Sequence, residues 1–270
     1  MTILILIRDT LLFSIIYGQI MIKAISTTGY VFAIMCFLNG LAYSKDDPWF
    51  VQLQGGADLA SHQDSLSINN HSNFPAPQNV DVYSLKSAHN GTVALTLGKQ
   101  FSDALPWISH YTISGRIQYI APSSVGNTIT LYSMPAFLNY NYNWNLSSLA
   151  VTADTKLSLL NSAKYAPYVN LGFGVSFNDT ESYSETALAG VTPRVSPGFA
   201  NHTTTQFTYH LGAGLDFNYN ASWRLSGGYE FESLGNFASG QGQTTWSADA
   251  LHLNNHYTHM VLFGITYFIN

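Results

Sequence analysis

Cysteine is almost absent from the sequence: the single one, Cys36, lies inside an apolar run near the amino terminus. Residues 45–270 contain none, which excludes a disulfide framework and a thiolate metal site from that part of the chain. The residues before Cys36 are Ile34 and Met35, and because neither is small we do not expect a lipid anchor at this cysteine.

Charge is scarce as well. Charged residues make up 9% of the chain, whereas a soluble protein normally carries about 25%. Residues 45–270 hold eight Lys and Arg against fourteen Asp and Glu, a net charge of −6, so the charge balance gives no reason to expect nucleic acid as a partner. Tyr, Phe and Trp reach 14%, and low charge with abundant aromatic residues favours a membrane β-barrel.

Long apolar runs are confined to the amino terminus, and their absence after residue 44 argues against transmembrane helices there. Lys23, an apolar run over 30–41 and the small first and third residues of Ala42-Tyr43-Ser44 predict a secretory signal peptide over 21–44. Residues 1–20 are also apolar, and we interpret them as an upstream start-site extension. The alternative of two inner-membrane helices still leaves the downstream strands in need of an outer membrane.

The stretch 206–231 carries the clearest pattern in the rest of the chain. Apolar residues occupy every second position, polar or small residues fill the gaps, and a break at 219–222 predicts an antiparallel hairpin. A soluble sandwich gives the same alternation, but here the polar face combines glycines with Asp216, Arg224 and Glu230, which suits a narrow, charge-paired barrel interior. Only helices and closed barrels satisfy the backbone in lipid, so one such hairpin implies several more strands.

The alternation predicts an all-β fold, a transmembrane antiparallel up-and-down β-barrel formed by residues 45–270. Its eight expected strands cover 49–59, 91–101, 108–120, 147–160, 167–178, 206–218, 223–231 and 256–269. The connections alternate long and short, as expected of bacterial outer-membrane barrels, whose long loops face outside and whose short turns face the periplasm. We interpret the long connections as surface loops: 60–90, 121–145, 179–205 and 232–255. Within 121–145, residues 128–138 are also compatible with a strand, whereas the Tyr-, Asn- and Trp-rich segment 139–145 is typical of a surface loop, and we place the whole connection outside the membrane.

Four short segments resemble the OmpA/OmpX-like eight-stranded outer-membrane β-barrel family: Trp49-Phe50-Val51, Pro167 to Gly174, Leu211 to Asp216 and Gly264 to Phe268. The resemblance covers essentially all of residues 45–270. It implies a bacterial outer-membrane protein in contact with outer-membrane lipid and lipopolysaccharide. We expect a monomer without catalytic residues, cofactor or metal.

The resemblance also implies a carboxy-terminal signal that the barrel-assembly machinery reads as alternating apolar residues ending on an aromatic. The alternating set here is Val261, Phe263, Ile265, Tyr267 and Ile269. Ile269 takes the place of the final aromatic and Phe268 falls on the opposite parity, so we expect assembly by that machinery through a weaker signal.

Six charged residues fall on the inward parity of the expected strands: Arg116, Asp154, Lys156, Asp216, Arg224 and Glu230. They would form either the charged gate of a narrow channel or a structural ion-pair network that fills an eight-stranded interior. We favour the network, because such an interior is only wide enough for side chains to fill and buried charges must pair in any case.

The nine histidines show no metal-ligand spacing. A lipid A-modifying barrel enzyme would need a nucleophilic Ser or an activating His at the rim, and His256-Tyr257-Thr258-His259 is the nearest candidate. Glu230 and Glu232 are too few for an omptin-like protease. The sequence therefore favours a structural or surface-exposed adhesion role, in which the long loops would contact a host or surface ligand. A narrow channel is the first alternative, and a lipid A-modifying enzyme is the second.

Overall fold

The computed structural model describes residues 47–269 apart from 88, 106–107, 160–163 and 195–197. The expected signal peptide and upstream extension lie outside these described residues. No helix in the described ranges is long and apolar enough to cross a bilayer.

The described chain is built from β-strands joined by turns and three short 3-10 helices. The strands are β1 (Trp49–Ser61), β2 (Ser65–Asn69), β3 (Val80–Leu85), β4 (His89–Leu105), β5 (Ile108–Ser124), β6 (Gly126–Thr130), β7 (Leu138–Leu159), β8 (Tyr165–Ala187), β9 (His202–Asn218), β10 (Trp223–Ala238) and β11 (His252–Ile269). The 3-10 helices are η1 (Leu131–Ser133), η2 (Pro135–Phe137) and η3 (Thr245–Ser247).

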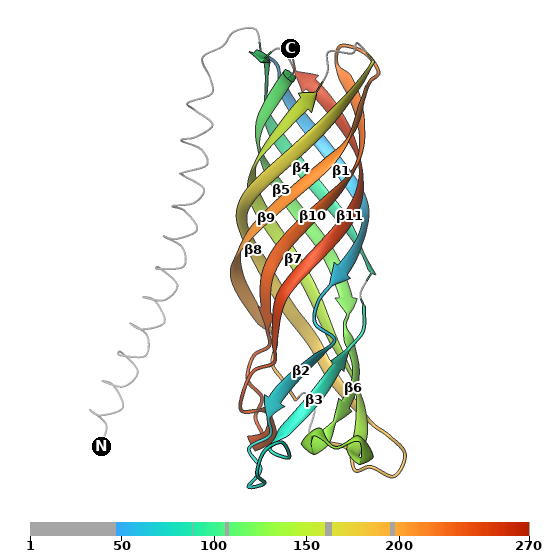
Figure 1. Cartoon of the computed structure of the whole chain (residues 1–270), viewed down its shortest axis with the longest axis vertical. Coiled ribbons are helices and arrows are strands. Elements are labelled where there is room, and N and C mark those ends of the chain that lie inside the picture. The colour runs from blue at the N-terminus through green and yellow to red at the C-terminus, as the bar shows by residue number, and fades with distance from the viewer. Residues whose placement is uncertain (1–46, 88, 106–107, 160–163, 195–197, 270) are drawn as a thin grey trace, which may run out of the picture. The chain divides into compact units, whose positions relative to one another are not determined.

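Eight of the strands close into a barrel (Figure 1). Around the ring the order is β1, β4, β5, β7, β8, β9, β10 and β11, and β11 pairs with β1 to complete it. All these pairings are antiparallel, and each strand lies beside the next one in the sequence. The prediction of an eight-stranded up-and-down barrel is therefore confirmed.

The hairpin at 206–231 forms as predicted, with β9 and β10 paired from Asn218 opposite Arg224 to Tyr209 opposite Ser233. Its turn is held by the side chain of Asn220, whose Oδ1 accepts hydrogen bonds from the backbone N–H groups of Ser222 and Trp223, both at 2.9 Å. An Asn side chain that imitates a backbone acceptor in this way is a common means of fixing a tight turn.

The predicted long loops prove to be largely ordered, and this corrects the sequence interpretation. β2 and β3 lie within the expected loop 60–90, and β6 lies within 121–145. These three strands continue the sheet from the edge of β7 beyond the barrel, in the order β2, β3, β6, β7. We call this region the extension: β2, β3 and β6, the segments 62–64, 70–79 and 86–87 that flank β2 and β3, the η1–η2 turn, the far ends of β7, β8 and β10, the start of β11, and the segments 188–194, 198–201 and 239–251.

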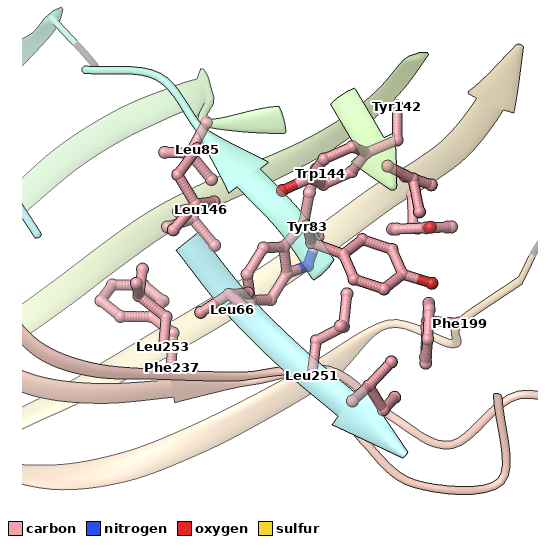
Figure 2. Packing of buried hydrophobic residues seen from close by; sticks show 14 of the residues in the cluster. Leu66, Tyr83, Leu85, Tyr142, Trp144, Leu146, Phe199, Phe237, Leu251 and Leu253 are labelled. Atoms are coloured by element: carbon pink, nitrogen blue, oxygen red, sulfur yellow. The ribbon is translucent and has the colours of Figure 1, made fainter. Parts of the chain in front are cut away.

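The hydrophobic core of the protein lies in the extension (Figure 2). Trp144 and Tyr83 are 1% and 0% exposed and pack with leucines from β2, β7 and β11. Tyr83 meets Tyr142 and Phe199 edge to face, with ring centroids 5.3 Å and 6.2 Å apart. Edge-to-face pairs are a favourable aromatic geometry, so the core orders segments that are distant in the sequence.

Segment 139–145, expected as a surface loop, is part of β7 and supplies this core with Tyr140, Tyr142 and Trp144. From Tyr140 onward, the even-numbered residues of β7 face inward. They are apolar as far as Leu146 and mostly polar from Ser148 onward, where the strand enters the barrel. The hydrophobic phase thus reverses in mid-strand, and that reversal made the segment look irregular in the sequence.

Candidate functional site

The outer surface of the barrel is a belt of exposed apolar side chains. Leu53, Phe207 and Phe263 are 62%, 65% and 68% exposed, and their neighbours on adjacent strands are likewise apolar. Aromatic residues mark the end of the belt at the short turns, where the rings of Trp223 and Tyr267 lie 4.9 Å apart. Because so large an exposed apolar surface is rare on a soluble monomer, this belt is the lipid-facing surface of a transmembrane barrel.

The polar interior of the barrel brings all six sequence-predicted lumen residues together in two clusters. In the first, Arg116 of β5 reaches Glu230 of β10, with Nη1 2.8 Å from Oε1, and Asp154 of β7, with Nη1 3.9 Å from Oδ2. Arg116 and Glu230 are 2% and 3% exposed. Since both charges are withdrawn from water, each depends on the other for compensation.

The second cluster lies nearer the short turns. Asp216 of β9 is fully buried and accepts from Lys156 of β7, with Nζ 2.7 Å from Oδ1. Nη1 of Arg224 lies 3.6 Å from the other carboxylate oxygen of Asp216. Over both clusters three cations face three carboxylates, so the charges of the six residues compensate one another.

The structure adds to these clusters residues that the sequence analysis did not assign to the lumen network. His210 joins the first cluster, with Nε2 3.3 Å from Oδ2 of Asp154. Asn170 donates to Glu230 at 2.8 Å, and Gln118 donates to Glu232 at 3.0 Å. The available signal for His210, Asn170 and Gln118 was their parity, since they are polar residues at inward positions of predicted strands, whereas Glu232 falls in the expected loop 232–255.

The lumen between the clusters is nearly filled. Tyr168 lies across it beneath the Lys156 ammonium, whose Nζ is 3.9 Å from the ring centroid. A Cβ on Gly214 would come within 2.5 Å of the Tyr168 hydroxyl, so glycine there leaves room for the ring. A cavity of about 40 Å³ is lined by Arg116, Tyr168 and Glu230 among others. That volume holds roughly three water molecules.

The carboxy-terminal residues proposed as an assembly signal lie on the lipid-facing side of β11. Val261, Phe263, Ile265, Tyr267 and Ile269 are between 44% and 68% exposed. Phe268, on the opposite parity, is 5% exposed inside the barrel, where its ring centroid lies 4.7 Å from Cζ of Arg224. Phe268 thus closes the second charge cluster and does not contribute to the outward-facing set.

The histidines considered for lipid A chemistry do not lie together. His256 is buried in the base of the extension, stacked on His62 at 5.7 Å and edge to face with Phe237 at 4.9 Å. His259 points outward, where its Nδ1 is hydrogen-bonded to the Tyr229 hydroxyl at 2.6 Å. Within the described ranges, no group of three or more His, Cys, Asp or Glu could hold a metal ion.

Burial shifts several ionisable groups of the extension. The pKa of His256 is lowered to about 3, first by burial and then by His62. Burial also raises the pKa of Tyr83 and of Tyr142 above the ordinary tyrosine value. The pKa of Glu185 is raised by burial against the opposing charge of Arg194. His256 and both tyrosines are therefore neutral at pH 7, as members of an apolar core should be.

The far end of the extension, the apex, carries a second group of exposed apolar side chains: Phe74, Met134, Phe137 and Leu138, which are 57%, 38%, 40% and 45% exposed. Tyr132 joins two of them, because its ring lies edge to face with Phe74 at 5.6 Å and with Phe137 at 5.7 Å. The apex was not singled out in the sequence, where its residues are scattered over two segments of expected loop.

No protein-family model and no curated protein sequence matches the chain. Among solved structures it is similar to Neisserial surface protein A, at 11% identity and a TM-score of 0.47, over 81% of this chain and 96% of that one. It is also similar to the outer membrane protein OprG from Pseudomonas aeruginosa, at 11% identity and a TM-score of 0.47, over 82% and 97%. A third match is Ail, the attachment invasion locus protein of Yersinia pestis, at 13% identity and a TM-score of 0.36, over 82% and 98%.

The assignment of the fold rests on the pairings of this chain. Eight antiparallel strands close a ring, polar side chains fill it, and apolar side chains cover its outside. Closed barrels with this arrangement are the transmembrane form of bacterial outer-membrane proteins. The chain therefore has the fold of the OmpA/OmpX-like eight-stranded β-barrels of the bacterial outer membrane.

Proposed function

We propose that this outer-membrane barrel serves as a rigid base that presents the apex of the extension to a partner at the cell surface. The observation that carries the proposal is the separate core of the extension, which includes Trp144 at 1% and Leu253 at 0% exposure. Ordering so long a segment costs conformational entropy, and burial of the core offsets that cost. A protein that needed only a membrane anchor would gain nothing from this extension.

The apex is held in one conformation by partly buried polar contacts. Oδ1 of Asp81 accepts a hydrogen bond from the Tyr132 backbone N–H at 2.9 Å, and the Ser133 hydroxyl donates to the Val80 carbonyl at 3.0 Å. Tyr132 and Ser133 both have positive φ values, 55° and 53°, which are unfavourable for residues other than glycine. Neighbouring contacts hold this strained turn, so the apex is pre-organised for binding.

The composition of the apex favours an uncharged, apolar contact. Residues 65–80 and 126–153, which include the apex, contain no Asp, Glu, Lys or Arg. The exposed aromatic rings offer large contact areas with few rotatable bonds to immobilise, and Met134 adds an adaptable apolar side chain beside them. These features support adhesion to an apolar protein or cell surface and disfavour recognition of a polyanion, for which clustered Lys and Arg would be needed.

The two alternatives from the sequence have less support. A channel needs an open path, and the clusters around Arg116 and Asp216 leave a cavity of only about 40 Å³. An enzyme needs assembled catalytic groups, and His256 is buried while His259 is bonded to Tyr229. We therefore expect that the wild-type protein gives no reproducible channel openings in planar bilayers. We also expect that its expression leaves the acyl chains of lipid A unchanged.

The proposal is tested by expressing the protein on the surface of a non-adherent bacterium and counting cells bound to an epithelial monolayer. Wild-type cells should adhere, and the Phe74→Ser/Phe137→Ser variant should lose most of that adherence at equal surface expression. The matched control is Asn73→Ser/Asn127→Ser, which alters exposed polar residues of the same extension. Equal adherence of all three strains would contradict a role for the apex.

A further inference from the structure

Arg194, in the connection between β8 and β9, occupies an enclosed position in the extension. Its guanidinium carbon lies 4.5 Å from the ring centroid of Tyr140 and 4.0 Å from that of Trp246. Its Nε lies 3.2 Å from Oε2 of Glu185, and its Nη1 lies 3.8 Å from Oδ2 of Asp81. The side chain is 12% exposed.

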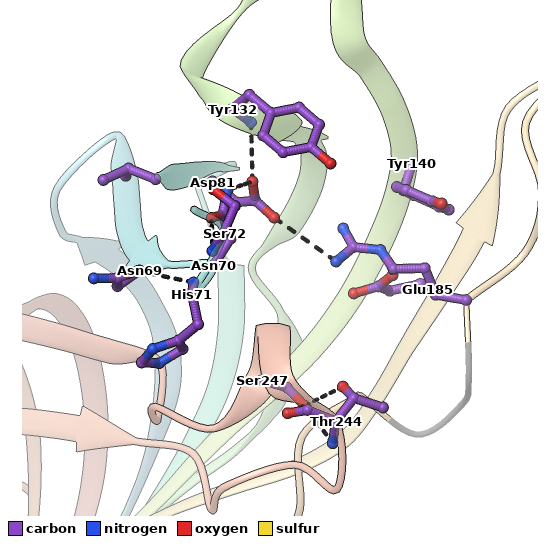
Figure 3. Close-up of polar contacts among 12 residues, drawn as sticks. Asn69, Asn70, His71, Ser72, Asp81, Tyr132, Tyr140, Glu185, Thr244 and Ser247 are labelled. Carbon is purple, nitrogen blue, oxygen red and sulfur yellow. Dashed lines mark hydrogen bonds and ion pairs between the residues drawn. The ribbon is translucent and has the colours of Figure 1, made fainter. Parts of the chain in front are cut away.

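The walls of this position come from different parts of the extension. Asp81 belongs to β3, Tyr140 to β7, Glu185 to β8 and Trp246 to η3. Figure 3 shows Asp81, Tyr140 and Glu185 on three ribbons that face a common space. Two aromatic faces and two carboxylates are the chemistry that recognises a guanidinium, which is planar and always charged.

Contacts that do not involve Arg194 hold several of these walls. Oδ1 of Asp81 accepts hydrogen bonds from Asn70 Nδ2 at 2.8 Å and from the Tyr132 backbone N–H at 2.9 Å. The Tyr183 hydroxyl donates to Glu185, and the Tyr140 hydroxyl donates to the Thr192 carbonyl at 2.9 Å. The position is therefore a preformed site, which Arg194 enters from a connecting segment.

Arg194 fits this site incompletely. Among the described residues, Nε and Nη2 of Arg194 have no hydrogen-bond partner of good geometry, and neither does Oε2 of Glu185. A carboxylate and a guanidinium that approach fork to fork form two parallel hydrogen bonds, and such pairs are the stronger ones. Oε2 of Glu185 is therefore an acceptor of the site that Arg194 leaves unused, and an arginine that approached Glu185 fork to fork would satisfy it.

We propose that Asp81, Tyr140, Glu185 and Trp246 form a binding site for an arginine side chain of a partner protein, with Arg194 as the internal ligand that fills it in the free protein. The inference deepens the proposed surface role, because it names a chemical group that a partner would present. Arg194 competes with that group, so the apparent affinity of the wild type is reduced by the fraction of molecules in which the site is closed.

The test uses the full-length protein in detergent and N-acetyl-arginine methylamide as the probe, with binding measured by calorimetry. Removal of the internal ligand in Arg194→Ala should strengthen binding of the probe by about tenfold or more over the wild type. The neutral isostere N-acetyl-citrulline methylamide should not bind, because it has the shape of arginine without the charge. Equal binding of the two probes to Arg194→Ala, or no binding of either, would overturn the proposal.

Matched variants in the Arg194→Ala background locate the site. Glu185→Gln should abolish the arginine preference, whereas Lys86→Gln, which removes an exposed charge elsewhere in the extension, should leave it unchanged. If Arg194→Ala loosens the extension, resistance to protease becomes the readout: the arginine probe should restore it and the citrulline probe should not. Restoration by both probes alike would count against the site.

The outcome is independent of the adherence experiment. Failure of the Phe74→Ser/Phe137→Ser strain to lose adherence removes the apex as a contact surface and leaves arginine binding to Arg194→Ala intact. Conversely, an absence of arginine binding removes this site while adherence through the apex stands.

Discussion

The barrel and the extension are formed by the same continuous strands but have opposite interiors. Inside the barrel, β7 presents Thr152 and Asp154, and its outward side chains, such as Leu149, are exposed. Inside the extension the same face of β7 presents Tyr142 and Trp144, and the outward Asn143 is exposed. Which side is apolar depends on what surrounds the strand, lipid in one region and water in the other.

The opposite interiors of the barrel and the extension show that the same β-sheet geometry is stable in lipid and in water. Hydrogen bonding along the sheet continues through both regions, so the backbone is satisfied in each. In water the extension is stabilised by burial of apolar side chains. In lipid the apolar side chains of the barrel face outward, and the charges withdrawn into its interior compensate one another in pairs such as Arg116 with Glu230. The two regions should therefore respond differently to the same kind of substitution.

The largest expected effect is Trp144→Ala, which removes a side chain that is 1% exposed in the core of the extension. Loss of so large a buried aromatic should lower the free energy of unfolding of the extension by about 4 kcal/mol. The barrel should keep its heat-modifiable migration on gels while protease cleaves the extension at lower urea concentration. The control Leu138→Ala, on the same strand but 45% exposed, should change either readout little. Simultaneous loss of both regions would show that they unfold as one unit.

The next effect concerns the lipid-facing belt. Leu53 is 62% exposed and lies between Leu95 and Ile265 near the middle of the belt. Leu53→Arg should destabilise the barrel by about 3 kcal/mol, because the charge enters hydrocarbon. Phe137→Arg, at an apex residue that is 40% exposed, should change stability by less than about 0.5 kcal/mol, because its surroundings are water. Urea unfolding in lipid vesicles measures both, and equal losses would contradict the assignment of the belt to lipid.

Most of the barrel could be predicted from the sequence, because strict alternation identifies strands whose two faces meet lipid and polar interior. Arg116 and Glu230 could be placed in the lumen by parity alone. Their pairing could not, since it depends on strand register and on which strands lie opposite each other across the ring.

The extension could not be predicted because its strands turn their apolar side chains inward, whereas the same strands turn them outward in the barrel. At Leu146 and Ser148 the apolar residues of β7 change parity, so a search for one continuous alternation ends there and reads Tyr140, Tyr142 and Trp144 as loop. The Arg194 site was equally hidden, because its residues come from segments spread over more than 160 positions of the chain.

The smallest of the three effects is a pH dependence confined to the extension. His256 has its pKa lowered from 6.5 to about 3 by burial. As pH falls below 6.5, His256 binds a proton in the unfolded chain but not in the folded chain. Its contribution to the free energy of unfolding is therefore fully present above pH 6.5 and is lost progressively towards pH 3. At pH 5 the loss should be about 2 kcal/mol relative to pH 7.5. His256→Gln removes this contribution and leaves those of the other titratable groups, so the wild type should lose more protease resistance on acidification than the variant. Parallel pH profiles for the two proteins would mean that water reaches His256 and that the core of the extension is open at its base.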